Sequence, residues 1–329
     1  MKKSLQPFLS GIIDYAGLYP PASLDLQDSF KKYLEHAHSK ESWILSKFVV
    51  GTSLLSDLSD LINDTNESPN PFLITLVAAP SATIDEFKSV LNNTTAQIRE
   101  VVNSSEKSIH IPTLEIKLPS GIDYKNLSEL SEVIDFTVHQ LNSSAIFPNQ
   151  AFFEIPGFEF ASQKAIALTQ AISNHNYGLK PESLDNYESS GFKVRCGGVE
   201  AFQFPPVEYL VETISTAIKS NVPLKFTAGL HHPVRHYNES VSTKMHGFLN
   251  VFGGTILYNR KTMDDSVLAD ILSDENPNNF SFSETGFSWK NHSVKTQEIH
   301  TLRAFSATSF GSCSFDEPVE DLQELTLLN

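Results

Sequence analysis

Residues 191-GFKVRCGGVEAFQFPPVEYLVETISTAIKSNVPLKFTAG-229 contain two short β-like runs on either side of an amphipathic segment at 206–219. Each run ends in glycine. Parallel strands need a crossover of about a dozen residues or more, and the crossover is usually a helix. The stretch therefore predicts a strand–helix–strand unit in which 191–198 and 223–229 are neighbouring parallel strands.

The same pattern recurs along the rest of the chain. We expect eight strands, at 11–16, 43–50, 72–79, 110–118, 151–157, 191–198, 223–229 and 247–254. Apolar residues at helical spacing predict helices at 26–38, 84–102, 122–142, 161–174 and 206–219, whereas 231–246 looks mostly like loop. Eight strands alternating with helices predict a (β/α)8 TIM barrel, with an open doubly wound α/β sheet as the alternative.

The length of 329 residues suits one such barrel with an extension. A polar stretch at 274–279 marks a boundary. We therefore expect a barrel over 1–275 and a C-terminal extension over 276–329, which includes a helix near 296–308 and is too short to fold alone. The segment 310-FGSCSFDEP-318 is predicted to pack on the barrel loops.

Composition excludes several classes of partner. The net charge of −15, from 39 acidic and 24 basic residues, disfavours nucleic acid and anionic membranes, although a basic pocket can still capture a small anion. Two cysteines cannot form a dense disulfide framework. With no apolar core for a signal peptide and no apolar run long enough to span a bilayer, we expect a cytoplasmic protein. The sequence is compatible with an oligomer.

Charged residues stand at unusual positions in the predicted strands. Alternation places Lys193, Arg195 and Gly197 on one face of their strand, and Lys225, Thr227 and Gly229 on one face of the next. Other strands add Asp14, Lys47, Glu115, Lys117, Glu154 and Asn250. If these side chains face inward, they form a mixed-sign cluster at the barrel mouth that requires mutual pairing or a ligand. The alternative is that some of them face outward and pair with surface residues.

Lys193 and Lys225 stand at matching places on adjacent predicted strands. A lysine becomes nucleophilic near pH 7 when burial and a neighbouring cation lower its pKa by about 3 units. We therefore expect both lysines to share one pocket, with Lys193 as nucleophile or electrostatic catalyst. The alternative is that Glu115 and Glu154 neutralise the two lysines in a structural network.

The two lysine-bearing strands resemble those of class I aldolases of the deoxyribose-phosphate aldolase type, including a glycine four residues after each lysine. The resemblance implies that Lys193 forms the Schiff base and that Lys225 depresses its pKa. Glu115 matches the acidic proton shuttle of that family only loosely. The sequence departs from the family at Val194-Arg195-Cys196, and Arg195 would crowd the aldolase pocket, so a carboxylate is a more credible substrate than a sugar phosphate.

A second resemblance covers nearly the whole chain. The stretches 12-IIDYAGLYPPA-22, 193-KVRCGGVEAFQFPP-206, 225-KFTAGLHHPVRH-236, 246-HGFLNVF-252 and 310-FGSCSFDEP-318 are similar to a family of bacterial proteins of unassigned function. This resemblance implies no activity. It implies that these loops belong together.

The glycines, His231 and Cys313 complete the candidate set. Gly197, Gly198 and Gly229, with Gly253-Gly254, could expose backbone N–H groups to an anion. His231 follows a strand directly and is a candidate acid or base, or an anchor for its loop. Cys313 is expected to be a buried small residue rather than a nucleophile.

These observations favour an enzyme with lysine-dependent, aldolase-like lyase chemistry on a small anionic carbonyl compound, without a cofactor or a metal. In this hypothesis Lys193, Lys225, Glu115, Glu154 and His231 are catalytic. The substrate-binding residues are Arg195, Lys47, Lys117, Asp14, Thr227, Gly197, Gly198, Gly229 and Asn250. A metal-dependent hydrolase using His231, Glu154 and Asp14 is a second hypothesis. A third is a barrel that binds a ligand without turnover.

Overall fold

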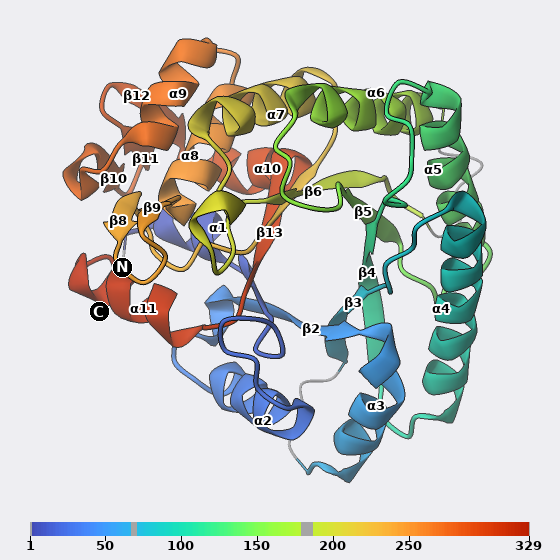
Figure 1. The fold of residues 1–329 in the computed structure, drawn as a ribbon. Helices are drawn as coiled ribbons and strands as arrows, with labels where there is room; N and C mark the ends of the chain where they lie inside the picture. The colour runs from blue at the N-terminus through green and yellow to red at the C-terminus, as the bar shows by residue number, and fades with distance from the viewer. Residues whose placement is uncertain (1, 67–70, 179–186, 329) are drawn as a thin grey trace.

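The computed structural model describes residues 2–66, 71–178 and 187–328. Its centre is a closed barrel of eight parallel strands, in the order β1-β13-β7-β6-β5-β4-β3-β2 (Figure 1). This confirms the predicted TIM barrel and excludes the open sheet. The barrel strands are β1 (Ile13–Tyr15), β2 (Leu45–Gly51), β3 (Phe72–Val77), β4 (Ile109–Lys117), β5 (Gln150–Glu154), β6 (Gly191–Arg195), β7 (Leu224–Thr227) and β13 (Ala307–Ser312).

Helices surround the barrel, and a side-chain cap marks the start of several of them. The Asp25 side chain accepts a hydrogen bond from the Asp28 N–H at the start of α2, and Thr83 accepts one from Glu86 at the start of α4. The predicted helices are confirmed as α2 (Leu26–Ala37), α4 (Ile84–Ser104), α5 (Leu127–Asn142), α6 (Ser162–Gly178) and α7 (Val207–Lys219). The others are α1 (Leu5–Leu9), α3 (Leu55–Asp64), α8 (Phe248–Asn259), α9 (Asp265–Ser273), α10 (Thr296–Ser306) and α11 (Asp316–Glu324).

The prediction of an eighth strand at 247–254 is wrong. Gly247 is the N-cap of α8, and residues 248–254 lie within this helix. Because α8 is buried on all sides, its continuous apolar sequence resembles that of a buried strand. β13 takes the eighth place and pairs with β1 through Ile13 and Phe310 and with β7 through Thr227 and Gly311. The Phe310 ring stacks on Phe248 of α8, with centroids 5.6 Å apart.

The C-terminal region is consequently part of the barrel. The expected division at residue 275 assigned 276–329 to an extension, but β13 lies in that range and closes the barrel. The chain between β7 and β13 includes the hairpin β8 (His236–Asn238) and β9 (Thr243–Met245), within the segment that was expected to be mostly loop. It also includes the antiparallel sheet β10 (Phe280–Phe282), β11 (Gly286–Trp289) and β12 (His292–Lys295).

The antiparallel sheet packs against the N-terminal helix. The Phe8 ring of α1 lies 5.1 Å from that of Phe282 and 4.8 Å from that of Phe287, between centroids. Arg303 of α10 donates a 2.9 Å hydrogen bond to the Phe8 carbonyl oxygen. These contacts lie where the chain enters β1 and β13, so they cover the amino-terminal end of the barrel. Among the described residues, no helix is long and apolar enough to cross a membrane.

Candidate active site

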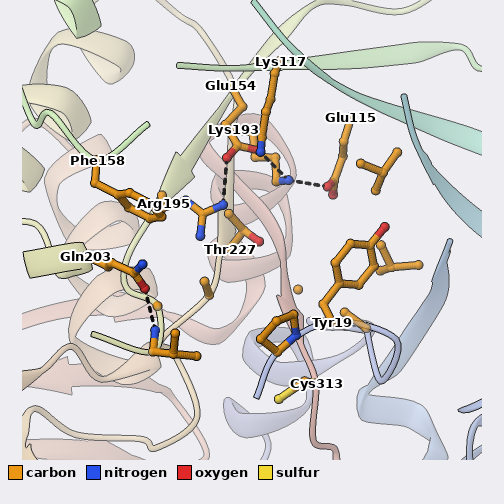
Figure 2. Close-up of a pocket in the computed structure, with 18 of the residues that line it drawn as sticks. Tyr19, Glu115, Lys117, Glu154, Phe158, Lys193, Arg195, Gln203, Thr227 and Cys313 are labelled. Carbon is orange, nitrogen blue, oxygen red and sulfur yellow. Dashed lines mark hydrogen bonds and ion pairs between the residues drawn. The ribbon is translucent and has the colours of Figure 1, made fainter. Parts of the chain in front are cut away.

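A cavity of about 320 Å³ opens at the carboxyl ends of the barrel strands (Figure 2). This is the end at which TIM barrels hold their active sites. The predicted site residues that line it are Glu115, Lys117, Glu154, Lys193, Arg195, Gly198, Thr227 and His231. Strand alternation thus correctly predicted which side chains of β4, β5 and β6 face inward.

Lys193 lies at the centre of an ion-pair cluster in this cavity. Its Nζ is 2.7 Å from Glu115 Oε2 and 2.7 Å from Glu154 Oε2. The second oxygen of Glu154 accepts a 3.0 Å hydrogen bond from the Arg195 guanidinium. The Lys193, Glu115 and Glu154 side chains are all at least nine-tenths buried. Each charge therefore has an opposite charge in contact, as buried ions require.

This pairing reverses the predicted behaviour of Lys193. Burial by itself lowers the pKa of a lysine, but the carboxylates of Glu115 and Glu154 outweigh it and raise the pKa of Lys193 above its ordinary value. Burial would raise the pKa of Glu154, yet Lys193 and Arg195 lower it to about 2. Lys193 is therefore a protonated ammonium at neutral pH, and the prediction of a pKa lowered by about 3 units is wrong.

A second charged cluster lies deeper in the barrel. Asp14 on β1 forms an ion pair with Lys225 on β7, and its other oxygen is 3.4 Å from Lys47 Nζ on β2. Thr75 and Ser309 donate hydrogen bonds of 3.1 and 3.2 Å to the same carboxylate. Burial would raise the pKa of Asp14, but Lys225 and Lys47 lower it well below its ordinary value. Burial also lowers the pKa of Lys47, although Asp14 opposes the shift.

Glu115 connects the two clusters, because its Oε1 lies 3.5 Å from Lys225 Nζ. Lys225 faces the barrel interior as predicted, but its side chain is only 1% exposed and does not line the cavity. Asp14 and Lys47 do not line it either. The expectation that both lysines share one pocket is therefore wrong: Lys193 faces the cavity, and Lys225 lies beneath its floor. The reason is depth, which strand alternation does not predict.

The predicted glycines have different roles. A Cβ on Gly197 would lie 2.5 Å from the Phe204 ring and 2.8 Å from the Gly229 Cα, so these two glycines allow the loops after β6 and β7 to approach closely. Gly229 also has a φ of +71°. Neither lines the cavity, whereas Gly198 does.

Asn250 is not at the barrel mouth. It lies in α8, where its side-chain amide donates to the carbonyl oxygens of Ile271 and Asp274 at 2.7 and 2.8 Å. Its side-chain oxygen accepts a 2.9 Å hydrogen bond from the Arg235 N–H. The substrate-binding role predicted for Asn250 depended on the misassigned eighth strand, so the structure replaces it with a role in holding loops.

His231 lines the cavity, but its Nδ1 is 3.0 Å from Glu317 Oε2 of α11. The ligand set of the hydrolase hypothesis is not assembled, since Glu154 pairs with Lys193 and Arg195, and Asp14 lies beneath the floor. Within residues 2–66, 71–178 and 187–328, no group of three or more His, Cys, Asp or Glu side chains could hold a metal ion.

Comparison with known proteins adds little. No protein-family model matches the chain, and no curated protein matches it. Among solved structures, it is similar to a native Bacteroidetes-affiliated GH5 cellulase linked with a polysaccharide utilization locus, with 10% sequence identity over 93% of this chain and 98% of that one. The TM-score is 0.37, so this likeness carries no argument about the reaction. The resemblance to class I aldolases stays a prediction.

Several residues that line the cavity were not predicted as site residues, and Cys313, which was expected to be buried, is only partly buried in the cavity wall. Tyr19, Phe158, Val199, Gln203 and Cys313 all line it, and Figure 2 shows Tyr19 and Cys313 on the side away from Arg195. Burial raises the pKa of Tyr19 to about 12, with Glu115 acting in the same direction. Tyr19 and Cys313 stand in the quoted motifs 12–22 and 310–318, and those motifs were the signal that could have found them.

Proposed function

We propose that the protein is an enzyme with aldolase-like lyase chemistry on a small anionic carbonyl compound, and that Lys193 is its electrostatic catalyst. The observation that carries the proposal is the position of the Lys193 ammonium, in the cavity wall and in contact with Glu115 and Glu154. A cation held at a fixed place in a buried site stabilises negative charge that develops in a transition state. The paired carboxylates supply a proton acceptor next to it.

The charge balance of the cavity favours an anionic substrate. Three cationic side chains, Lys117, Lys193 and Arg195, line it together with two carboxylates, Glu115 and Glu154, which leaves one positive charge in excess. In the described part of the chain, Lys117 forms no ion pair within 4.0 Å. We therefore assign the anionic group of the substrate to Lys117 and the Arg195 guanidinium, both of which line the cavity.

The proposed reaction is cleavage of a β-hydroxy carbonyl compound. Glu115 accepts the proton of the β-hydroxyl group, the carbon–carbon bond breaks, and an aldehyde leaves. The electron pair of that bond forms an enolate, whose oxyanion accepts hydrogen bonds from the Lys193 ammonium. Glu115 then returns the proton to the enolate carbon, which gives the second carbonyl product. The cycle needs no oxidant and no cofactor.

Proton exchange at the carbon beside a carbonyl group tests the proposal, because it reports the enolate half-reaction alone. The probes are pyruvate and dihydroxyacetone phosphate in D₂O, followed by NMR. We expect exchange with at least one probe above the protein-free rate. The rate should fall about 100-fold or more in Lys193→Met, the usual effect of losing one oxyanion donor, and by a similar factor in Glu115→Gln, the usual effect of losing a general base.

The matched control is Lys88→Met, which removes a partly exposed lysine of α4 that pairs with Glu132 of α5 and does not line the cavity. Its exchange rate should equal that of the unchanged protein. The proposal is wrong if neither probe exchanges, or if folded Lys193→Met exchanges as fast as the unchanged protein.

A further inference from the structure

We propose that the substrate carries an aromatic or similarly planar apolar group, and that Phe158, Val199 and Phe202 form the subsite for it. These three residues are called the aromatic rim below. The inference rests on the proposed function, because Lys117, Lys193 and Arg195 are taken to hold the anionic carbonyl end of the same molecule.

The aromatic rim exposes large apolar side chains beside one another. Phe158 is 37% exposed, Val199 44% and Phe202 65%. The two rings meet edge to face, with centroids 5.6 Å apart and an interplanar angle of 86°. Exposed apolar side chains that cluster in this way mark binding surfaces more often than single ones do. Aromatic rings favour offset-stacked or edge-to-face contacts with a further aromatic group.

The rim continues directly from the cationic part of the cavity. Phe158 and Val199 line the cavity, and the Arg195 guanidinium carbon lies 5.2 Å from the centre of the Phe158 ring. In Figure 2 Phe158 lies beside Arg195, which bonds to Glu154. When the anionic group of a ligand contacts Arg195, the adjoining part of the ligand therefore lies against the Phe158 ring. The arrangement fits an amphipathic anion rather than a molecule that is polar throughout.

The loop that carries Val199 and Phe202 is held in place from within. Gln203 Oε1 accepts hydrogen bonds from the Val199 and Glu200 N–H groups, at 2.6 and 3.2 Å. Phe204 packs against Gly197 and Gly229, where a Cβ would meet its ring. Phe202 thus remains exposed on an anchored loop. A subsite that is already ordered loses little conformational entropy when a ligand binds.

A pair of ligands with the same anionic carbonyl end tests the inference. The probes are pyruvate and phenylpyruvate, titrated calorimetrically into the full-length protein. We expect phenylpyruvate to bind more tightly than pyruvate. Phe202→Ser should weaken phenylpyruvate about 2- to 10-fold, the range of one aromatic contact, and leave pyruvate unchanged. Phe202 is exposed, so its replacement does not disturb the core.

The matched control is Phe305→Ser. Phe305 is 72% exposed and lies in α10, which precedes β13 and so stands at the opposite end of the barrel. It should change neither affinity. The inference is wrong if both ligands bind equally well, or if Phe202→Ser weakens both equally, and in those cases Lys193-dependent exchange of pyruvate still supports the proposed function. If neither ligand binds, the anionic carbonyl site fails together with the rim.

Discussion

Lys193 and Glu115 form a buried ion pair, with Nζ 2.7 Å from Oε2, and the other oxygen of this carboxylate lies 3.5 Å from Lys225 Nζ. Glu115 is therefore shared between the cluster that lines the cavity and the cluster beneath it. The relationship explains why Lys193 is protonated although it is buried. It also makes the candidate catalytic residues part of the charge balance that stabilises the barrel.

Removing the lysine charge should destabilise the fold. Lys193→Met leaves Glu115 and Glu154 buried with one cation fewer, and breaking a buried pair costs about 3–5 kcal/mol of unfolding free energy. We expect the lower end, about 3 kcal/mol, because Arg195 and Lys225 still contact the two carboxylates. Urea unfolding measures the loss. Adding Glu115→Gln should recover part of it, whereas a single Lys193→Met variant within 0.5 kcal/mol of the unchanged protein, roughly the scatter of surface substitutions, would contradict this account.

Acid should remove the contribution of Glu154. Its pKa is lowered in the folded state, from an ordinary value of 4.5 to about 2, so the carboxylate stabilises the fold at pH values above 4.5. This stabilisation is lost as the pH falls from about 4.5 towards 2. The unfolding free energy of Glu154→Gln should therefore fall less steeply with acid than that of the unchanged protein. If the unfolding free energies of the two proteins fall in parallel with pH, the ion pairs of Glu154 do not stabilise the folded state.

The C-terminal strand should be essential for folding. β13 pairs with β1 and β7, so deleting residues 307–329 opens the barrel and uncovers Phe248 and Phe252, which contact Phe310. We expect this deletion to give insoluble or unfolded protein. Deleting only 325–329 keeps β13 and α11 and should preserve a cooperative thermal transition. If the longer deletion melts like the full chain, β13 does not close the barrel in solution.

Much of the barrel could be predicted from the sequence because most strands are short apolar runs followed by amphipathic helices. The eighth strand could not. α8 is buried on every side, so it has no polar stripe to mark it as a helix. β13, 307-ATSFGS-312, consists largely of small and hydroxylated residues and has little of the β-branched and aromatic content that marks a strand.

The sequence predicted which side chains of the candidate site face the barrel interior, but not how deep in the barrel each one lies. A period of two indicates which side chains face the barrel interior, and it correctly placed Lys193, Arg195 and Glu115 there. It carries no information on the layer in which a side chain lies: Lys193 and Lys225 are register partners on β6 and β7, as expected, yet only Lys193 lines the cavity. The direction of the Lys193 pKa shift was mispredicted for the same reason. The charges nearest to Lys193 are the carboxylates of Glu115 and Glu154, which raise its pKa, and not Lys225.

The central claim is that Lys193 acts as a protonated ammonium and not as a nucleophile. Borohydride reduction at pH 7 in the presence of pyruvate or dihydroxyacetone phosphate, followed by peptide mass spectrometry, tests it most directly. We expect proton exchange of the probe to continue without a reduced adduct on Lys193, because its raised pKa leaves little neutral amine at this pH. A stoichiometric adduct on Lys193, absent in Lys193→Met, would contradict the account and establish a Schiff-base mechanism instead.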